Sequence, residues 1–92
     1  MTTIRKLEKM PYAQAHVEIN ENGAFLFSYN TLAAAVSADG WLSVYCLCSQ
    51  TTRRHVSAFL AEYAQESYAT GKQLFTNGMR MSLLTGEIEP ED

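Results

Sequence analysis

The chain has 92 residues, of which 47% are hydrophobic and 18% are charged, and its formal net charge is −3. This length predicts a single domain over residues 1–92 with one core. The charged share is below the ~25% of an ordinary soluble domain, which favours an exposed apolar patch. The acidic balance argues against a general DNA-binding protein, because such proteins displace counterions with an excess of Lys and Arg.

Composition also argues against a membrane or secreted protein. No apolar run approaches the ~20 residues of a membrane span, and residues 1–11 lack the apolar stretch of a signal peptide. Cys46 and Cys48, two residues apart on an expected strand, have a poor geometry for bridging each other. We therefore expect a reducing, cytoplasmic environment.

The first third of the chain has the patterns of strands. Residues 1–11 predict only a short turn or a loose, peripheral edge segment that ends at Pro11. Residues 14–20 alternate between apolar and polar side chains, which predicts a half-buried strand. Glu21-Asn22-Gly23 is typical of a hairpin turn. Residues 24–29 predict a second strand.

Residues 30–36 are ambiguous, because their alanines favour a helix while their length and flanks favour a strand. We expect the second strand to continue through them past a bend or bulge near Asn30. A turn at residues 38–40 then leads into the next strand.

Residues 41–48 predict a strand with two largely apolar faces. One of these faces carries Trp41, Tyr45 and Leu47. Either both faces are covered within the domain, or one of them is covered by a second copy of the chain. Because the opposite face is already apolar, we expect Trp41, Tyr45 and Leu47 to form the interface of a homodimer.

Two helices are expected next. Residues 51–64 carry an apolar stripe at i, i+3, i+4 and i+7, formed by Val56, Phe59, Leu60 and Tyr63. A second helix is expected over residues 67–77, and Gly71 on its apolar face predicts close approach to another element. Asn77-Gly78 predicts a left-handed C-cap.

Residues 79–84 predict a last strand, and the acidic residues 87–92 are expected to fray. The sequence thus predicts an α+β fold in the order β-β-β-α-α-β. A small antiparallel sheet of about four strands would pack against two helices.

The most polar stretch joins the strand 41–48 to the first helix, and it consists of Ser49, Gln50, Thr51, Thr52, Arg53, Arg54 and His55. On the simplest interpretation, a hydroxyl caps the helix and the arginines are solvated. Basic residues in a first turn oppose the helix dipole, however, and the free N–H groups there favour an anion. We therefore predict that Ser49, Thr51, Thr52, Arg53, Arg54 and His55 bind a phosphate or a partner's carboxylate. The stretch is not a P-loop.

Metal binding and catalysis have weaker support. Cys46, Cys48, His16 and His55 could supply zinc ligands, but a Cys-x-Cys without a second Cys pair favours buried thiols instead. A Cys48–His55 nucleophile lacks an orienting acid. We expect no catalytic residue, no metal and no cofactor.

One run of residues resembles small, uncharacterised phage and mobile-element proteins of gut-type bacteria, with the core Y-S-x-T-T-x-R-H-[IV]-x-x-F-L. The matching residues are Tyr45-x-x-x-Ser49-x-Thr51-Thr52-x-Arg54-His55-x-x-x-Phe59-Leu60-x-Glu62-Tyr63, preceded by Ser28-Tyr29-Asn30-Thr31. Cys48 stands where such sequences often have Tyr or Trp. The resemblance covers about residues 27–63 and implies a small accessory protein in the cytoplasm of a bacterial host.

Together, these features predict a non-enzymatic protein that inhibits or sequesters a host component. Its partner would be a host protein or a phosphate-bearing small molecule. Two alternatives stay open. One is a nucleic-acid-binding regulator, for which the net charge gives a weak attraction. The other is a structural homo-oligomer.

Overall fold

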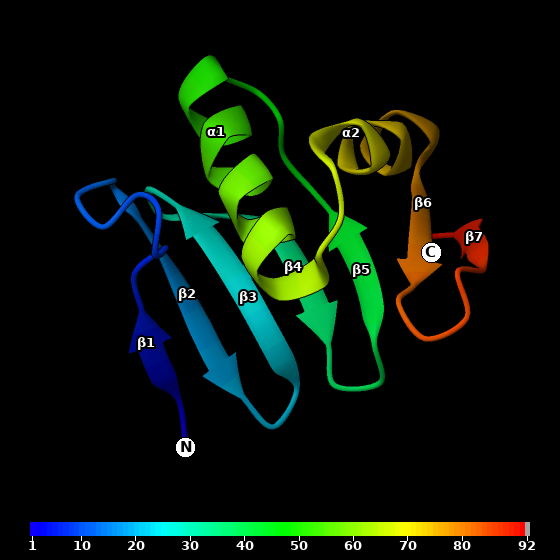
Figure 1. Cartoon of the computed structure of the whole chain (residues 1–92), viewed down its shortest axis with the longest axis horizontal. Coiled ribbons are helices and arrows are strands. Elements are labelled where there is room, and N and C mark those ends of the chain that lie inside the picture. The colour runs from blue at the N-terminus through cyan, green and yellow to red at the C-terminus, as the bar shows by residue number, and fades with distance from the viewer. Residues whose placement is uncertain (92) are drawn as a thin grey trace.

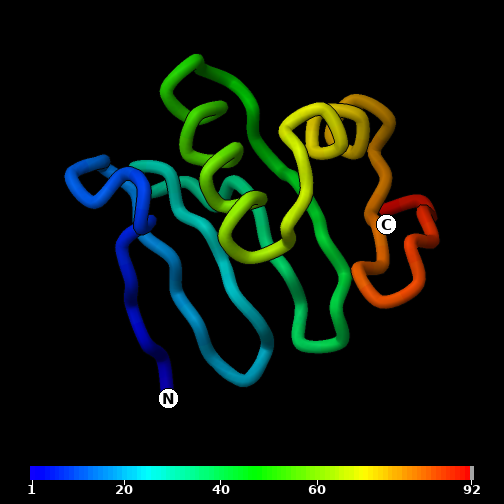
Figure 2. The backbone as a smooth tube through the Cα atoms, in the orientation of Figure 1, coloured from blue at the N-terminus to red at the C-terminus, as the bar shows by residue number. Residues whose placement is uncertain are grey.

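The computed structural model, which describes residues 1–91, has one antiparallel sheet (Figure 1). Its seven strands follow one another in chain order. They are β1 (Thr3–Arg5), β2 (Ala15–Asn20), β3 (Gly23–Ser28), β4 (Thr31–Ser37), β5 (Trp41–Val44), β6 (Met79–Ser82) and β7 (Ile88–Pro90). Because β1 and β7 are the two edge strands, the two ends of the chain lie at opposite edges of the sheet (Figure 2).

The helices are inserted between the neighbouring strands β5 and β6. They are α1 (Gln50–Phe59), the π-helical turn η1 (Leu60–Ala64) and α2 (Tyr68–Asn77). All three lie on the same face of the sheet (Figure 1). The α+β class, the two helices and the antiparallel sheet are confirmed, but the expected number of about four strands is wrong.

The largest error concerns residues 24–36, which form a hairpin rather than one long strand. The chain reverses at Tyr29-Asn30, so that Ser28 pairs with Thr31. Tyr29 has a φ of 58°, a left-handed conformation that is an outlier for a bulky residue. A bulge does exist, but it lies at Ala33, which has no partner between the pairs Leu26–Ala34 and Phe27–Leu32.

Both ends of the chain are better ordered than expected. The segment 1–11 forms β1 and buries the side chain of Leu7 completely. The C-terminal segment forms β7, and Glu89 on this strand makes an ion pair with Arg80 on β6. The expectation of fraying is therefore wrong for Ile88–Pro90. Asp92, the last residue of the segment expected to fray, lies outside the described residues.

The core fills the space between the inner face of the sheet and the helices. The predicted stripe of α1 and η1 is confirmed, since Val56, Phe59 and Leu60 are fully buried. They belong to the same core cluster as the inner-face residues Val17, Leu26, Ala34, Leu42 and Val44. Phe59 is the largest fully buried side chain, which makes α1 the centre of the core.

Gly71 lies on the buried side of α2, where the helix approaches Leu60. A Cβ atom at this position would be 2.6 Å from Leu60 Cδ1 and 3.6 Å from Val44 Cγ2. The predicted close approach is confirmed. The left-handed cap at Gly78 is confirmed as well, with a φ of 64°.

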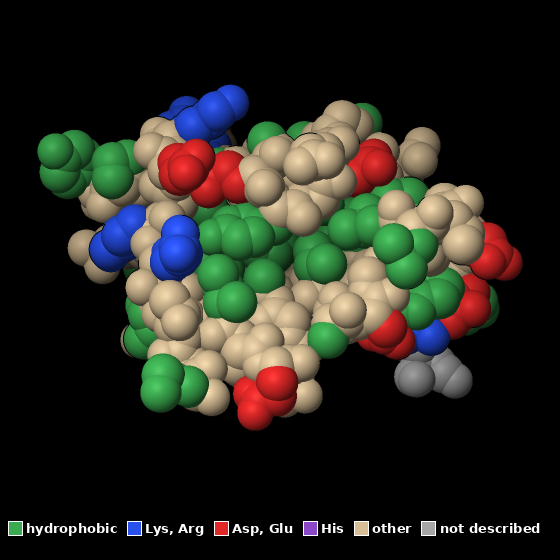
Figure 3. Space-filling model, turned by 60° about the horizontal axis from the view of Figure 1, so that its bottom comes forward, with side chains coloured by type: hydrophobic (Ala, Val, Ile, Leu, Met, Phe, Trp, Pro, Cys, Tyr) green, Lys and Arg blue, Asp and Glu red, His purple; other side chains and the backbone are tan. Residues whose placement is uncertain are grey.

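The helices do not cover the end of the sheet that carries the β2–β3 and β4–β5 turns. There Ile19, Ala24 and Val36 lie side by side on the inner face, next to Leu42, and are half-buried. Seen from this end, apolar side chains gather below the helices (Figure 3). This is the kind of exposed apolar patch that the low charge content favours.

Candidate functional site

Four polar side chains from β3 and the start of α1 form a hydrogen-bonded chain. Ser49 Oγ lies 3.0 Å from Thr52 Oγ1, which lies 3.0 Å from Ser28 Oγ, which lies 2.8 Å from His55 Nδ1. Ser28, Thr52 and His55 are 2%, 5% and 1% exposed. Burial of polar groups is costly unless they are hydrogen-bonded, so this chain fixes the position of α1 on β3.

The same residues begin α1. Ser49 is the N-cap, and its Oγ accepts a hydrogen bond of 3.1 Å from the backbone N–H of Thr52. The predicted hydroxyl cap is confirmed. The ring of Tyr29 lies 6.1 Å from that of His55. The two parts of the sequence motif, Ser28-Tyr29 and the start of α1, therefore meet in space.

This arrangement changes the interpretation of three predicted site residues. Thr52 and His55 are enclosed by the chain and bonded to each other through Ser28. Ser49 uses its hydroxyl to cap the helix. Their observed contacts attach α1 to the sheet.

Burial lowers the pKa of His55 below its ordinary value. Below about pH 6.5 the unfolded chain takes up a proton that the folded protein excludes. The free energy of unfolding is therefore expected to fall as the pH is lowered, by at most about 1.4 kcal/mol per pH unit, and to lose this dependence above pH ~6.5. Urea titrations between pH 7 and pH 5 measure the slope. It should persist in His16→Ala and disappear in His55→Ala; the same slope in both variants would contradict the assignment.

Arg53 and Arg54 point away from the buried chain and line a groove between α1 and α2. The groove has a volume of about 400 Å³ and is lined by Gln50, Arg53, Arg54, Ser57, Tyr68 and Lys72. It contains three cationic side chains and no carboxylate. Thr51, the remaining predicted site residue, is exposed on the first turn of α1.

Arg53 is held by the segment that leads into α1. Its Nε donates a hydrogen bond of 3.0 Å to the backbone carbonyl of Leu47. Next to the groove lies a hollow of about 200 Å³, which shares Arg53, Tyr68 and Lys72 and adds Leu47, Phe75 and Thr76. Phe75 is 41% exposed, so the hollow offers an apolar surface beside the cations.

The sequence identified only one wall of this groove. Gln50 and Ser57 lie one turn from Arg53 and Arg54, and helical periodicity could have found them. Tyr68 and Lys72 come from α2, and no sequence pattern relates them to α1. The packing of the two helices brings them together.

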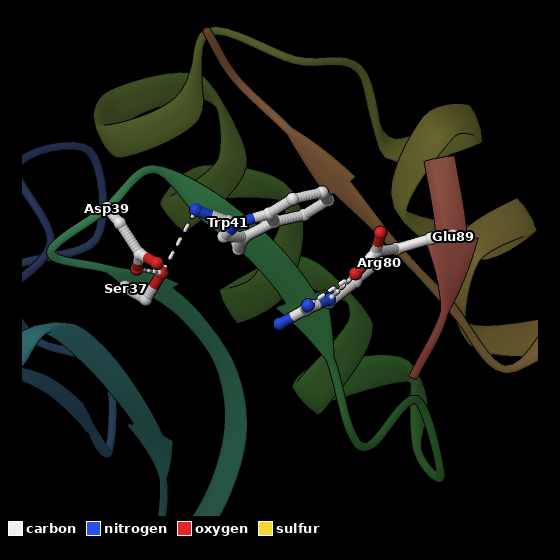
Figure 4. Close-up of polar contacts among 5 residues, drawn as sticks. All are labelled: Ser37, Asp39, Trp41, Arg80 and Glu89. Atoms are coloured by element: carbon white, nitrogen blue, oxygen red, sulfur yellow. Dashed lines mark hydrogen bonds and ion pairs between the residues drawn. The ribbon is translucent and has the colours of Figure 1, made fainter. Parts of the chain in front are cut away.

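The three residues expected at an interface separate in the structure. The strand ends at Val44, so the alternation expected through residue 48 stops there. Leu47 is only 6% exposed and packs in the core. Trp41 lies on the sheet face opposite the helices, with the guanidinium of Arg80 4.3 Å from its ring centre. Figure 4 shows this pair and Glu89, whose Oε1 accepts a 2.9 Å hydrogen bond from Arg80 Nε. Tyr45 is 46% exposed.

The two cysteines lie closer together than expected. Their Sγ atoms are 2.6 Å apart, with Cys48 exposed and Cys46 half-buried. That prediction placed both cysteines on an extended strand, whereas the strand ends at Val44 and both thiols are free. Within residues 1–91, no three His, Cys, Asp or Glu side chains are grouped as metal ligands.

A family of unknown function, DUF8033, matches residues 2–77. The chain belongs to this family. The match runs from β1 through α2, so it includes the buried polar chain, both walls of the groove and the two cysteines. Comparisons with curated proteins and with solved structures find no match. Within residues 1–91, no helix has the length and apolar character that crossing a membrane requires.

Proposed function

We propose that this DUF8033 member is a non-enzymatic binding protein that holds an anionic group of its partner in the groove between α1 and α2. The observation that carries this proposal is the meeting of Arg53, Arg54 and Lys72 in one groove without a carboxylate. The chain has only seven Lys and Arg residues against ten Asp and Glu. Concentrating three of the seven in one place produces a local positive potential on an acidic protein.

The unfavourable placement of two arginines near the N-terminus of α1 supports a binding role. The first turn of α1 has no acidic residue, and two arginines lie near it, where the helix dipole favours negative charge. A bound phosphate or carboxylate would reverse this unfavourable contact, since Arg can hold either group bidentately. Tyr68 and the neighbouring Phe75 would contact an apolar part of the same partner.

The biological setting belongs to the same proposal. The resemblance to phage and mobile-element proteins supports an accessory protein that acts in the cytoplasm of a bacterial host. Inhibition or sequestration of a host protein, or of a phosphate-bearing small molecule, fits a groove on the surface better than catalysis does. His55, the candidate base in the stretch that begins α1, is 1% exposed and hydrogen-bonded to Ser28.

Nucleic-acid binding is the second candidate, and the same three cations favour it. It predicts a different response to salt. A protein that neutralises three phosphates would lose affinity steeply with log salt, with a slope of about −2 to −3. A single carboxylate or phosphate group gives a slope nearer to −1.

We expect Arg54→Gln to weaken anion binding at least tenfold, because it removes one of the three charges that converge on the groove. Chemical-shift titration of the ¹⁵N-labelled protein with inorganic phosphate, and with a hexaglutamate peptide, measures the affinity. The shifts should centre on residues 50–57 and 68–72. Arg5→Gln is the matched control, since Arg5 is exposed on β1 outside the groove. Equal affinity in the two variants, or no shifts in the groove with either probe, would refute the proposal.

We also propose that a homodimer forms through the sheet face opposite the helices. This face carries Phe25, Phe27 and Trp41, which are half-buried. The molecule measures 33 × 31 Å along its two longer axes, enough for the ~800 Å² per partner of a standard interface. Sedimentation should show a dimer that Trp41→Glu converts to a monomer, with Tyr12→Glu as an exposed control. A wild-type monomer at ~100 µM would contradict the dimer.

A further inference from the structure

We propose that Cys46 and Cys48 form a dithiol site that is oxidised reversibly to an intrachain disulfide by a low-molecular-weight disulfide of the glutathione type. The two Sγ atoms are 2.6 Å apart, well inside van der Waals contact, so little movement is needed to join them. Disulfides in reducing compartments are mostly transient and redox-sensing. This site is separate from the anion groove, and its chemistry does not depend on the proposed function.

The backbone after β5 creates this geometry. The N–H groups of Tyr45 and Cys46 both donate to the carbonyl of Ala33, at 2.7 and 3.2 Å. Ala33 is the bulged residue of β4. Two consecutive donors on one acceptor turn the chain out of the strand after Val44, and the side chains of residues 46 and 48 no longer follow the spacing of a strand.

The exposures of the two thiols assign their roles. Cys48 is exposed, and its thiolate attacks one sulfur of glutathione disulfide, releasing one glutathione thiolate and forming a mixed disulfide at Cys48. Cys46 is half-buried and directly adjacent, and its thiol loses a proton and attacks Cys48 Sγ, expelling the second glutathione thiolate. The two cysteines lose two electrons and two protons, and glutathione disulfide becomes two glutathione molecules.

The local electrostatics are consistent with this order. The hydrogen bond that the Cys46 thiol donates to Cys48 Sγ and, secondarily, burial raise the pKa of the Cys46 thiol. A raised pKa keeps the Cys46 thiol protonated, and a protonated thiol is a poor nucleophile toward the oxidant. Cys46 therefore acts as the resolving thiol, which reacts once the exposed partner carries the mixed disulfide.

Oxidation of the two cysteines would affect the groove between α1 and α2 through one residue, Leu47. Leu47 lies between the two cysteines, and its carbonyl accepts the hydrogen bond from Arg53 Nε. A disulfide closes a small ring around this residue and reorients its carbonyl, which releases or shifts Arg53. This consequence rests on the proposed function only where it concerns ligand affinity; the movement of Arg53 is measurable without a ligand.

Mass spectrometry of the full chain, equilibrated with glutathione disulfide and then alkylated, tests the site. We expect a species lighter than the reduced protein by two hydrogen atoms, in more than about nine-tenths of the molecules, and its complete reversal by excess dithiothreitol. Cys46→Ser should instead accumulate the mixed disulfide at Cys48. Cys48→Ser should react at least tenfold more slowly, because only the half-buried thiol remains.

Two outcomes would overturn the inference. If wild type accumulates glutathione adducts and no intrachain disulfide, the dithiol site is wrong. If the disulfide forms but the ¹⁵Nε–H resonance of Arg53 stays unchanged, the link to the groove is wrong. The Arg54 side-chain resonance is the internal reference, since Arg54 lines the groove but not the neighbouring hollow that Leu47 lines. Failure of phosphate to bind in the reduced protein would refute the proposed function alone.

Discussion

Replacing His55 with alanine is expected to lower the free energy of unfolding by about 3 kcal/mol. The substitution removes a side chain that is 1% exposed, which leaves a cavity between β3 and α1. It also removes the partner of Ser28 Oγ, one link of the buried polar chain. For a domain of this size, the loss corresponds to a fall in melting temperature of more than about 12 °C.

Chemical denaturation of His55→Ala and His16→Ala separates this effect from the loss of any histidine. His16 is half-buried on β2, where its ring stacks on Phe27 and pairs with Glu18, and its removal should cost less than about 1 kcal/mol. In a double-mutant cycle with Ser28→Ala, we expect a coupling of about 1 kcal/mol between residues 28 and 55. Additive effects would show that the hydrogen bond between them contributes nothing.

Gly71→Val is expected to lower the free energy of unfolding by about 2–3 kcal/mol. A Cβ atom at this position already falls 2.6 Å from Leu60 Cδ1, and the branched methyl groups of valine add to the overlap. Leu60 is fully buried and Val44 is 7% exposed, so neither side chain has room to withdraw. The helix must move away from β5, which opens the core beneath α2.

Ala69→Val is the matched control for this prediction, because Ala69 is exposed on the same helix. Its cost should be limited to the lower helix propensity of valine, about 0.5 kcal/mol. Equal stabilities of the two variants would mean that α2 is not held closely against β5. Since α2 forms one wall of the groove that we propose to bind an anion, Gly71→Val should also weaken the binding of phosphate, whereas Ala69→Val should not.

His55 belongs to the polar stretch at the start of α1 that suggested a function. A sequence rich in Ser, Thr, Arg and His at a helix start is open to two interpretations, a cap or a ligand site. The structure divides the residues between them. Ser49 bonds to Thr52, and Thr52 and His55 each bond to Ser28, while Arg53 and Arg54 line the groove with Lys72.

The sequence by itself determined several local elements in which one periodicity or one turn signal dominated. The apolar stripe of Val56, Phe59 and Leu60 predicted α1 and its buried face. The alternation in residues 14–20 predicted β2, and Asn77-Gly78 predicted the end of α2. These features depend on neighbours in the chain, whose spacing is written in the sequence.

The tertiary structure alone decided the features that need a distant partner. The reversal at Tyr29 needs a left-handed conformation that a bulky residue adopts only when surrounding contacts hold it, and no sequence rule anticipates it. The short edge strands β1 and β7 gain their hydrogen bonds from β2 and β6. Lys72 joins the arginines because α2 packs beside α1, and Cys46 meets Cys48 because Ala33 bends the chain. Each depends on contacts between segments far apart in the chain, which local spacing does not encode.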